Sequence, residues 1–163
     1  MNLFVKETGS GQPLVIVHGL FGSGDNWATL AKRFATNFHV VVVDLRNHGH
    51  SPHADEMNYD VMAEDLFDTM AALGLRDVYL LGHSMGGKVV LRFAQLYSFL
   101  VTKVIVADIA PRYYAPHHAS VIGALRALDF EKVKSRSEAA AILHAHLNDA
   151  STEQFLLKSL YWK

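Results

Sequence analysis

Cysteine is absent from this 163-residue chain, which excludes disulfides, thiolate metal sites and a cysteine nucleophile. An excess of charge of one sign is absent too, because 15 Lys and Arg stand against 16 Asp and Glu, giving a formal net charge of −1. The chain thus lacks the surplus of basic residues typical of nucleic-acid-binding proteins, and its balanced charge does not favour binding to anionic membranes. The length is that of one ordinary domain with room for a core.

Long uncharged apolar stretches are also lacking, since none approaches the roughly 20 residues of a membrane span. Residues 1–6 lack the basic and apolar regions of a signal peptide. Repeats and low-complexity tracts are missing as well. We therefore expect a soluble, cytoplasmic protein without a membrane span.

Apolar runs and helical patterns alternate over the first two thirds of the chain. We expect strands at 13–18, 40–43, 78–81 and 101–107, and helices at 26–34, 58–73 and 89–97. Asp25 or Asn26 is the expected cap of the first helix and Asn58 that of the second, which Gly74 ends. Continuous apolar strands joined by helices indicate a parallel sheet covered on both faces. Ligands bind such sheets at the carboxyl ends of the strands.

Residues 111–163 follow a different pattern. Three helical segments without a strand are predicted there, at about 120–128, 137–146 and 152–161. We expect an α/β core over residues 1–110 and a helical lid over residues 111–163, inserted above the carboxyl edge of the sheet.

The most informative motif is Gly82-His83-Ser84-Met85-Gly86, directly after an apolar run. A strand that becomes a helix within one residue strains that residue, so its neighbours must lack bulk and Ser84 is pushed out above the sheet edge. The unpaired amides of the first helical turn suit an oxyanion beside that hydroxyl. The segment predicts a nucleophile elbow of the kind found in serine hydrolases.

Three motifs in fixed order, Val15 to Gly22, Asp44 to Ser51 and the Ser84 elbow, together resemble the α/β-hydrolase superfamily. The finer detail resembles the YbfF branch of bacterial esterases: His-Gly-Leu-Phe-Gly-Ser, Arg-Asn-His-Gly, Gly-His-Ser-Met-Gly-Gly-Lys and Asp-Ile-Ala-Pro. The resemblance covers essentially the whole chain. It implies the α/β-hydrolase fold, a mostly parallel sheet with helices on both faces and a helical lid.

The same resemblance implies roles for four residues. Ser84 is the expected nucleophile, and the backbone amides of Leu20 and Met85 are the expected donors to the oxyanion. Phe21 is expected to bind substrate as part of the acyl-pocket wall. The sequence leaves open whether the Phe21 amide replaces that of Leu20 as a donor.

The carboxylate that orients the base is expected to be Asp108, which ends the strand beside the elbow strand and opens the Asp-Ile-Ala-Pro match. Many α/β-hydrolases carry this acid one strand later, and Asp108 as a plain strand-end cap is the alternative. Asp44 also ends a strand, but the family's strand order puts it beyond the strand of His18. We expect Asp44 to hold a turn together with Arg46.

The general base is the gap in the site, because none of the ten histidines fits that role. The resemblance places the base after the last strand. We therefore expect the catalytic His and the last two strands to lie beyond residue 163, in roughly another 80–100 residues. The ten histidines are interpreted as structural or exposed. No metal site is expected, since His144 and His146 would point to nearly opposite faces of a helix.

The sequence thus predicts a hydrolase that cleaves carboxylic esters or thioesters of small molecules through an acyl-enzyme, without cofactor or metal. Two alternatives remain. One is a catalytically incomplete fragment or a non-enzymatic acyl-binding scaffold, and the other is a cofactor-free haloperoxidase with the same triad. The acyl length, the leaving group and the oligomeric state stay open.

Overall fold

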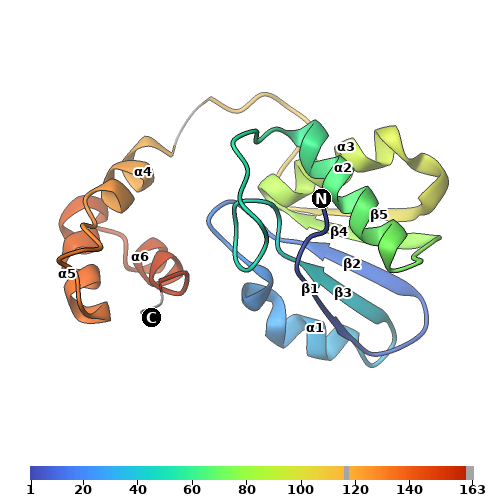
Figure 1. Ribbon diagram of the computed structural model, residues 1–163, viewed down its shortest axis with the longest axis horizontal. Coiled ribbons are helices and arrows are strands. Elements are labelled where there is room, and N and C mark those ends of the chain that lie inside the picture. The colour runs from blue at the N-terminus through green and yellow to red at the C-terminus, as the bar shows by residue number, and fades with distance from the viewer. Residues whose placement is uncertain (116–117, 161–163) are drawn as a thin grey trace. The chain divides into compact units, whose positions relative to one another are not determined.

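The computed structural model describes residues 1–115 and 118–160, and it forms two compact units, Met1–Pro111 and Arg112–Lys163. The first unit is an α/β unit and the second contains helices (Figure 1). The second unit's predicted function as a lid stays a prediction. Tyr161, the last residue of the third helix predicted there, lies outside the described residues.

The first unit is built on a five-stranded sheet with the order β1-β3-β2-β4-β5. β1 runs antiparallel to β3, and the other neighbouring strands are parallel. The strands are β1 (Val5–Thr8), β2 (Pro13–Val17), β3 (His39–Val43), β4 (Val78–His83) and β5 (Val101–Ala107). The helices are η1 (Gly24–Trp27), α1 (Ala28–Phe34), α2 (Tyr59–Ala72), α3 (Met85–Leu96) and η2 (Ser98–Leu100).

Helices cover both faces of this sheet, with α1 on one face and α2 and α3 on the other (Figure 1). Alternate residues of one strand therefore enter different cores. Val15 and Val17 of β2 belong to the core under α2 and α3. Leu14 and Ile16 of the same strand belong to the core under α1. Burial on both sides explains why these strands are continuous apolar runs.

The sequence prediction missed β1, because Val5-Lys6-Glu7-Thr8 is a polar run at the sheet's edge and most of it is exposed. The predicted first helix begins earlier than expected, with η1, and its cap was wrong. The Ser23 amide donates to Asn26 Oδ1 at 2.8 Å, while Asp25 pairs with Lys6. The predicted cap of α2 is confirmed, since Asn58 Oδ1 accepts the amides of the helix's first turn at 2.9 and 3.0 Å.

The second unit consists, over its described residues, of three packed helices and their connections. These are α4 (Ala119–Arg126), α5 (Arg136–Leu147) and α6 (Ala150–Leu157). Buried Leu143, Leu156 and Leu157 lie in its interior. His144 contacts Glu153 at 3.1 Å, while His146 Nδ1 bonds the Ile142 carbonyl at 2.9 Å. In the described part of the chain, no helix is long and apolar enough to cross a membrane.

Candidate active site

The strand register gathers the predicted site at one edge of the sheet. Val17 at the end of β2 is aligned with Gly82 of β4, and His83 at the end of β4 is aligned with Ala107 of β5. The residues that follow these strands, His18, Ser84 and Asp108, therefore leave the sheet side by side at its carboxyl edge. This is the edge at which parallel sheets bind ligands.

Ser84 has the strained backbone that the elbow requires, with φ 52° and ψ −118°. These angles are the mirror image of an extended conformation and lie outside the regions open to L-residues. The Ser84 amide donates to the Ala107 carbonyl at 3.0 Å, and the Ser84 carbonyl accepts the Gly87 amide at 2.9 Å. The turn thus begins α3 directly and leaves the serine half-buried.

Glycines make this turn possible by letting backbones approach closely. A Cβ built on Gly82 would lie 2.3 Å from the Gly86 carbonyl oxygen, and one on Gly86 would lie 2.4 Å from the carbonyl oxygens of Val17 and His18. A Cβ on Gly87 would meet the Ile109 side chain at 2.5 Å. The start of α3 is therefore packed against both β2 and the segment that follows Asp108.

Gly86→Ala is accordingly expected to destabilise the protein by about 3 kcal/mol, because the new methyl group overlaps backbone oxygens that have no room to move. Gly123→Ala is the matched control. Its added Cβ would meet nothing within 4 Å, and alanine in place of a mid-helix glycine adds about 1 kcal/mol of stability. Urea unfolding of both variants is the measurement. A Gly86→Ala variant as stable as the wild type would contradict the packing.

The loop after β2 forms a tight turn against the serine. The Gly22 amide donates to the Gly19 carbonyl at 3.1 Å, and Phe21 within the turn has φ 62°, which is uncommon for a residue with a bulky side chain. A methyl group built on Gly19 would lie 3.2 Å from the Cβ atom of Ser84. The turn that carries Leu20 and Phe21 is thus in contact with the elbow.

The two backbone amides predicted to bind the oxyanion, those of Leu20 and Met85, belong to the Gly19 turn and to the start of α3. Within the described residues, neither the Leu20 nor the Met85 amide makes a hydrogen bond. The Met85 amide belongs to the first turn of α3, where N–H groups lack helical partners. The Phe21 amide differs, because it donates to His48 Nε2 at 3.3 Å. The Met85 side chain itself packs against the core beneath α2 and α3.

Two buried histidines brace these loops and have both ring nitrogens engaged. His18 Nε2 accepts the Leu45 amide at 3.0 Å, and its Nδ1 bonds the Gly19 carbonyl at 2.8 Å. Burial lowers the pKa of His18 to about 4. His48 Nδ1 bonds the Arg46 carbonyl at 2.9 Å, and burial likewise lowers the pKa of His48. Both rings are neutral at pH 7, as expected of structural histidines.

Asp44 holds a turn, as expected, but not together with Arg46. Its buried carboxylate accepts the Gly24 amide at 2.6 Å and the His50 amide at 2.9 Å. Arg46 instead forms a two-point ion pair with Asp65 of α2. The partner was missed because the sequence carries no local signal for a contact across 19 residues.

Asp108 follows β5 with φ 57°, and its carboxylate is 84% exposed. Its Oδ2 lies 3.5 Å from His83 Nε2, and His83 in turn packs edge-on against Trp27, with ring centroids 6.3 Å apart. In the part of the chain that the structure describes, no histidine is hydrogen-bonded to the Ser84 hydroxyl. The predicted acid and nucleophile thus share an edge, and the base is not found among the described side chains.

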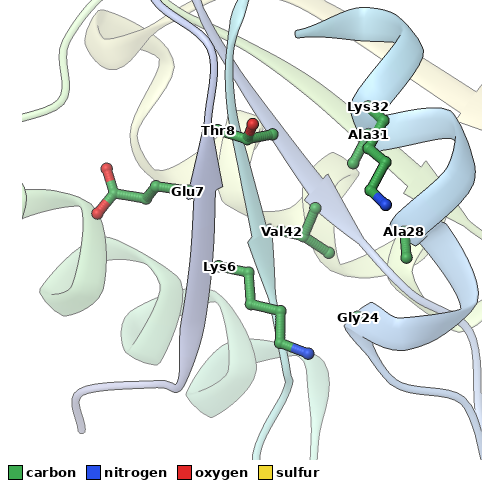
Figure 2. A pocket seen from close by; sticks show the side chains of 8 residues that line it. All are labelled: Lys6, Glu7, Thr8, Gly24, Ala28, Ala31, Lys32 and Val42. Atoms are coloured by element: carbon green, nitrogen blue, oxygen red, sulfur yellow. The ribbon is translucent and has the colours of Figure 1, made fainter.

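A separate groove of about 170 Å³ lies between β1, β3, η1 and α1. Its floor is apolar, with Val42, Ala28 and Ala31, and Lys6 and Lys32 stand at its rim; in Figure 2 the Glu7 side chain points away from it. None of the predicted site residues lines this groove. Within residues 1–115 and 118–160, no group of three or more His, Asp or Glu side chains is arranged to hold a metal ion.

Comparisons with known proteins agree with this fold. The family model for the alpha/beta hydrolase fold matches residues 12–160. Esterase YbfF of Escherichia coli (strain K12) is 43% identical over 148 residues, covering 90% of this chain and 58% of that protein. The sn-1-specific diacylglycerol lipase ABHD11 of Mus musculus is 37% identical over 155 residues, covering 90% of this chain and 50% of that protein.

Among solved structures, a marine microorganism esterase superposes with a TM-score of 0.96 at 42% identity, covering 99% of this chain and 65% of that one. The chain spans only 58% and 50% of the lengths of these two curated relatives. The family match covers nearly all of its residues, and the predicted resemblance to the YbfF branch is confirmed. The chain belongs to the α/β-hydrolase fold family.

Proposed function

We propose that this chain supplies the nucleophile, the orienting acid and the oxyanion donors of a serine hydrolase that cleaves carboxylic esters. The observation that carries the proposal is the Ser84 elbow, with φ 52° and ψ −118°, packed against the Gly19 turn. Strain of this size costs about 1–3 kcal/mol and persists where a function requires it. The esterases and the lipase among the relatives support ester substrates.

In the proposed reaction, Ser84 Oγ attacks the acyl carbonyl and forms a bond to its carbon, while a histidine accepts the hydroxyl proton. The Leu20 and Met85 amides bind the oxygen that becomes negative. The leaving alcohol takes the proton from the histidine, and water then hydrolyses the acyl-enzyme. Asp108 orients the histidine, which we propose lies outside these 163 residues. Thioesters fit the same steps, because they present the same acyl carbonyl.

The partners of this reaction are small-molecule acyl compounds, with Phe21 in the wall of the acyl pocket and residues 111–163 as the lid. No cofactor or metal takes part in the proposed steps. The cytoplasmic location is retained as a prediction from the sequence.

The test is hydrolysis of p-nitrophenyl esters by the full-length protein, together with a fluorophosphonate probe that bonds to an activated serine. We expect turnover and a single labelled residue, Ser84, in peptide mapping. Label on Ser10, Ser23 or Ser51 would overturn the assignment. Ester binding without turnover or label would favour the non-enzymatic acyl-binding scaffold instead.

A further inference from the structure

His48 lies directly behind the Gly19–Gly22 turn. Its Nε2 atom lies 3.3 Å from the Phe21 amide nitrogen, and its Nδ1 atom lies 2.9 Å from the Arg46 carbonyl oxygen. A carbonyl only accepts hydrogen bonds, so the ring proton is on Nδ1 and Nε2 is free to accept. The residue is buried, with 9% of its surface exposed. These contacts fix both its tautomer and its orientation.

The turn is clamped from two sides. On one side, Gly19 lies against Ser84 and His83, at 3.2 Å and 3.0 Å from a Cβ built on the glycine. On the other side, His48 accepts the Phe21 amide while that residue has φ 62°. A non-glycine residue keeps such a conformation only where its surroundings enforce it. His48 is therefore part of what enforces this turn.

The hydrogen bond also fixes the direction in which the Phe21 amide points. Phe21 and Leu20 were both open as donors on the sequence alone, yet the Phe21 N–H is directed to His48. We propose that His48 is a positioning residue: by binding the Phe21 amide it holds the turn so that the Leu20 amide faces the substrate oxygen beside Ser84. This inference rests on the proposed hydrolase function and assigns a role to a side chain that touches no substrate.

Protonation would remove this support, because Nε2 of a charged ring carries a proton and cannot accept from Phe21. The groups facing the ring are the Arg46 carbonyl, Asp44, His53 and the His18 ring, whose centroid lies 5.1 Å away. Burial is the largest influence and lowers the pKa of His48 below 6.5. The accepting form therefore predominates at pH 6.5 and above, and it is lost as the pH falls below the lowered pKa.

Three variants of the full-length protein test the role. His48→Leu removes the acceptor, and we expect kcat on a p-nitrophenyl ester to fall about 10²-fold, the loss typical of a slightly displaced group, with KM little changed. His48→Gln keeps an acceptor near the Nε2 position and should therefore recover most of the kcat that His48→Leu loses. His39→Leu, at a histidine that begins β3 and so lies at the opposite edge of the sheet from Ser84, is the control and should behave like the wild type.

A readout independent of activity is the NMR spectrum of the wild type and of His48→Leu. We expect the Nδ1–H tautomer at His48 and a slowly exchanging Phe21 amide, which becomes fast-exchanging in His48→Leu. An Nε2–H tautomer, or a Leu variant with wild-type kcat, would overturn the inference. If the wild type hydrolyses no ester, the proposed function has failed, and the tautomer and the Phe21 amide still decide whether His48 holds the turn.

Discussion

We expect Ser84→Ala to lower kcat on a p-nitrophenyl ester by about 10⁶-fold, as loss of the nucleophile does in a serine protease. The reason is that no acyl-enzyme forms without the hydroxyl, and the oxyanion amides alone contribute only a residual rate. KM should change little, because the proposed backbone donors and pocket wall remain. The measurement is turnover with enough enzyme to detect a rate near background.

Ser10→Ala is the control for this substitution. Ser10 is exposed in the turn between β1 and β2, so its removal should leave turnover unchanged. A Ser84→Ala variant that keeps even a tenth of the wild-type rate would show that another group attacks the ester, and the proposed function would have to be abandoned.

The strain at Ser84 gives the same site a second signature. Its backbone angles are the mirror image of an extended conformation, and glycine adopts this mirror-image region readily because it has no Cβ atom. Ser84→Gly should therefore be inactive like Ser84→Ala but melt at a higher temperature than it. An alanine variant that melts as high as the glycine variant would mean that the backbone stores no strain there.

The parallel core and its site edge were predictable because each strand carries its own signal. Val40 to Val43 is a continuous apolar run, as a strand buried on both faces must be. The position of Ser84 followed from the glycines around it, whose need for close approach is local in sequence. The prediction of Asp108 as the orienting acid rests on its position after the strand next to the elbow strand, together with the resemblance.

What the sequence did not reveal depends on contacts between distant residues. Arg46 was expected to hold a turn together with Asp44, but its ion-pair partner is Asp65, which lies on α2. The hydrogen bond from the Phe21 amide to His48 spans 27 residues and involves a backbone group, which no side-chain pattern marks. Edge strand β1 was missed for a related reason, since its polar residues are paired by backbone hydrogen bonds with β3.

Asp108→Asn is expected to lower kcat by about 10⁴-fold, the loss seen when the acid of a serine-protease triad becomes an amide. The carboxylate is proposed to hold the base in the tautomer that accepts the Ser84 proton and to stabilise the imidazolium that forms. An amide is uncharged and does not stabilise the imidazolium, and its NH2 group can donate to the ring and so favour the wrong tautomer. The fold should be unaffected, because asparagine tolerates the left-handed backbone that Asp108 has at φ 57°.

Asp77→Asn is the matched control, because Asp77 is also exposed, also has a positive φ, at 52°, and precedes the amino end of β4 rather than following a carboxyl end. The contact between Asp108 and His83 at 3.5 Å is too exposed to add more than about 1 kcal/mol. Both variants should therefore melt like the wild type, and only Asp108→Asn should lose turnover. Equal turnover in the two would assign Asp108 to capping β5 and move the orienting acid to another residue.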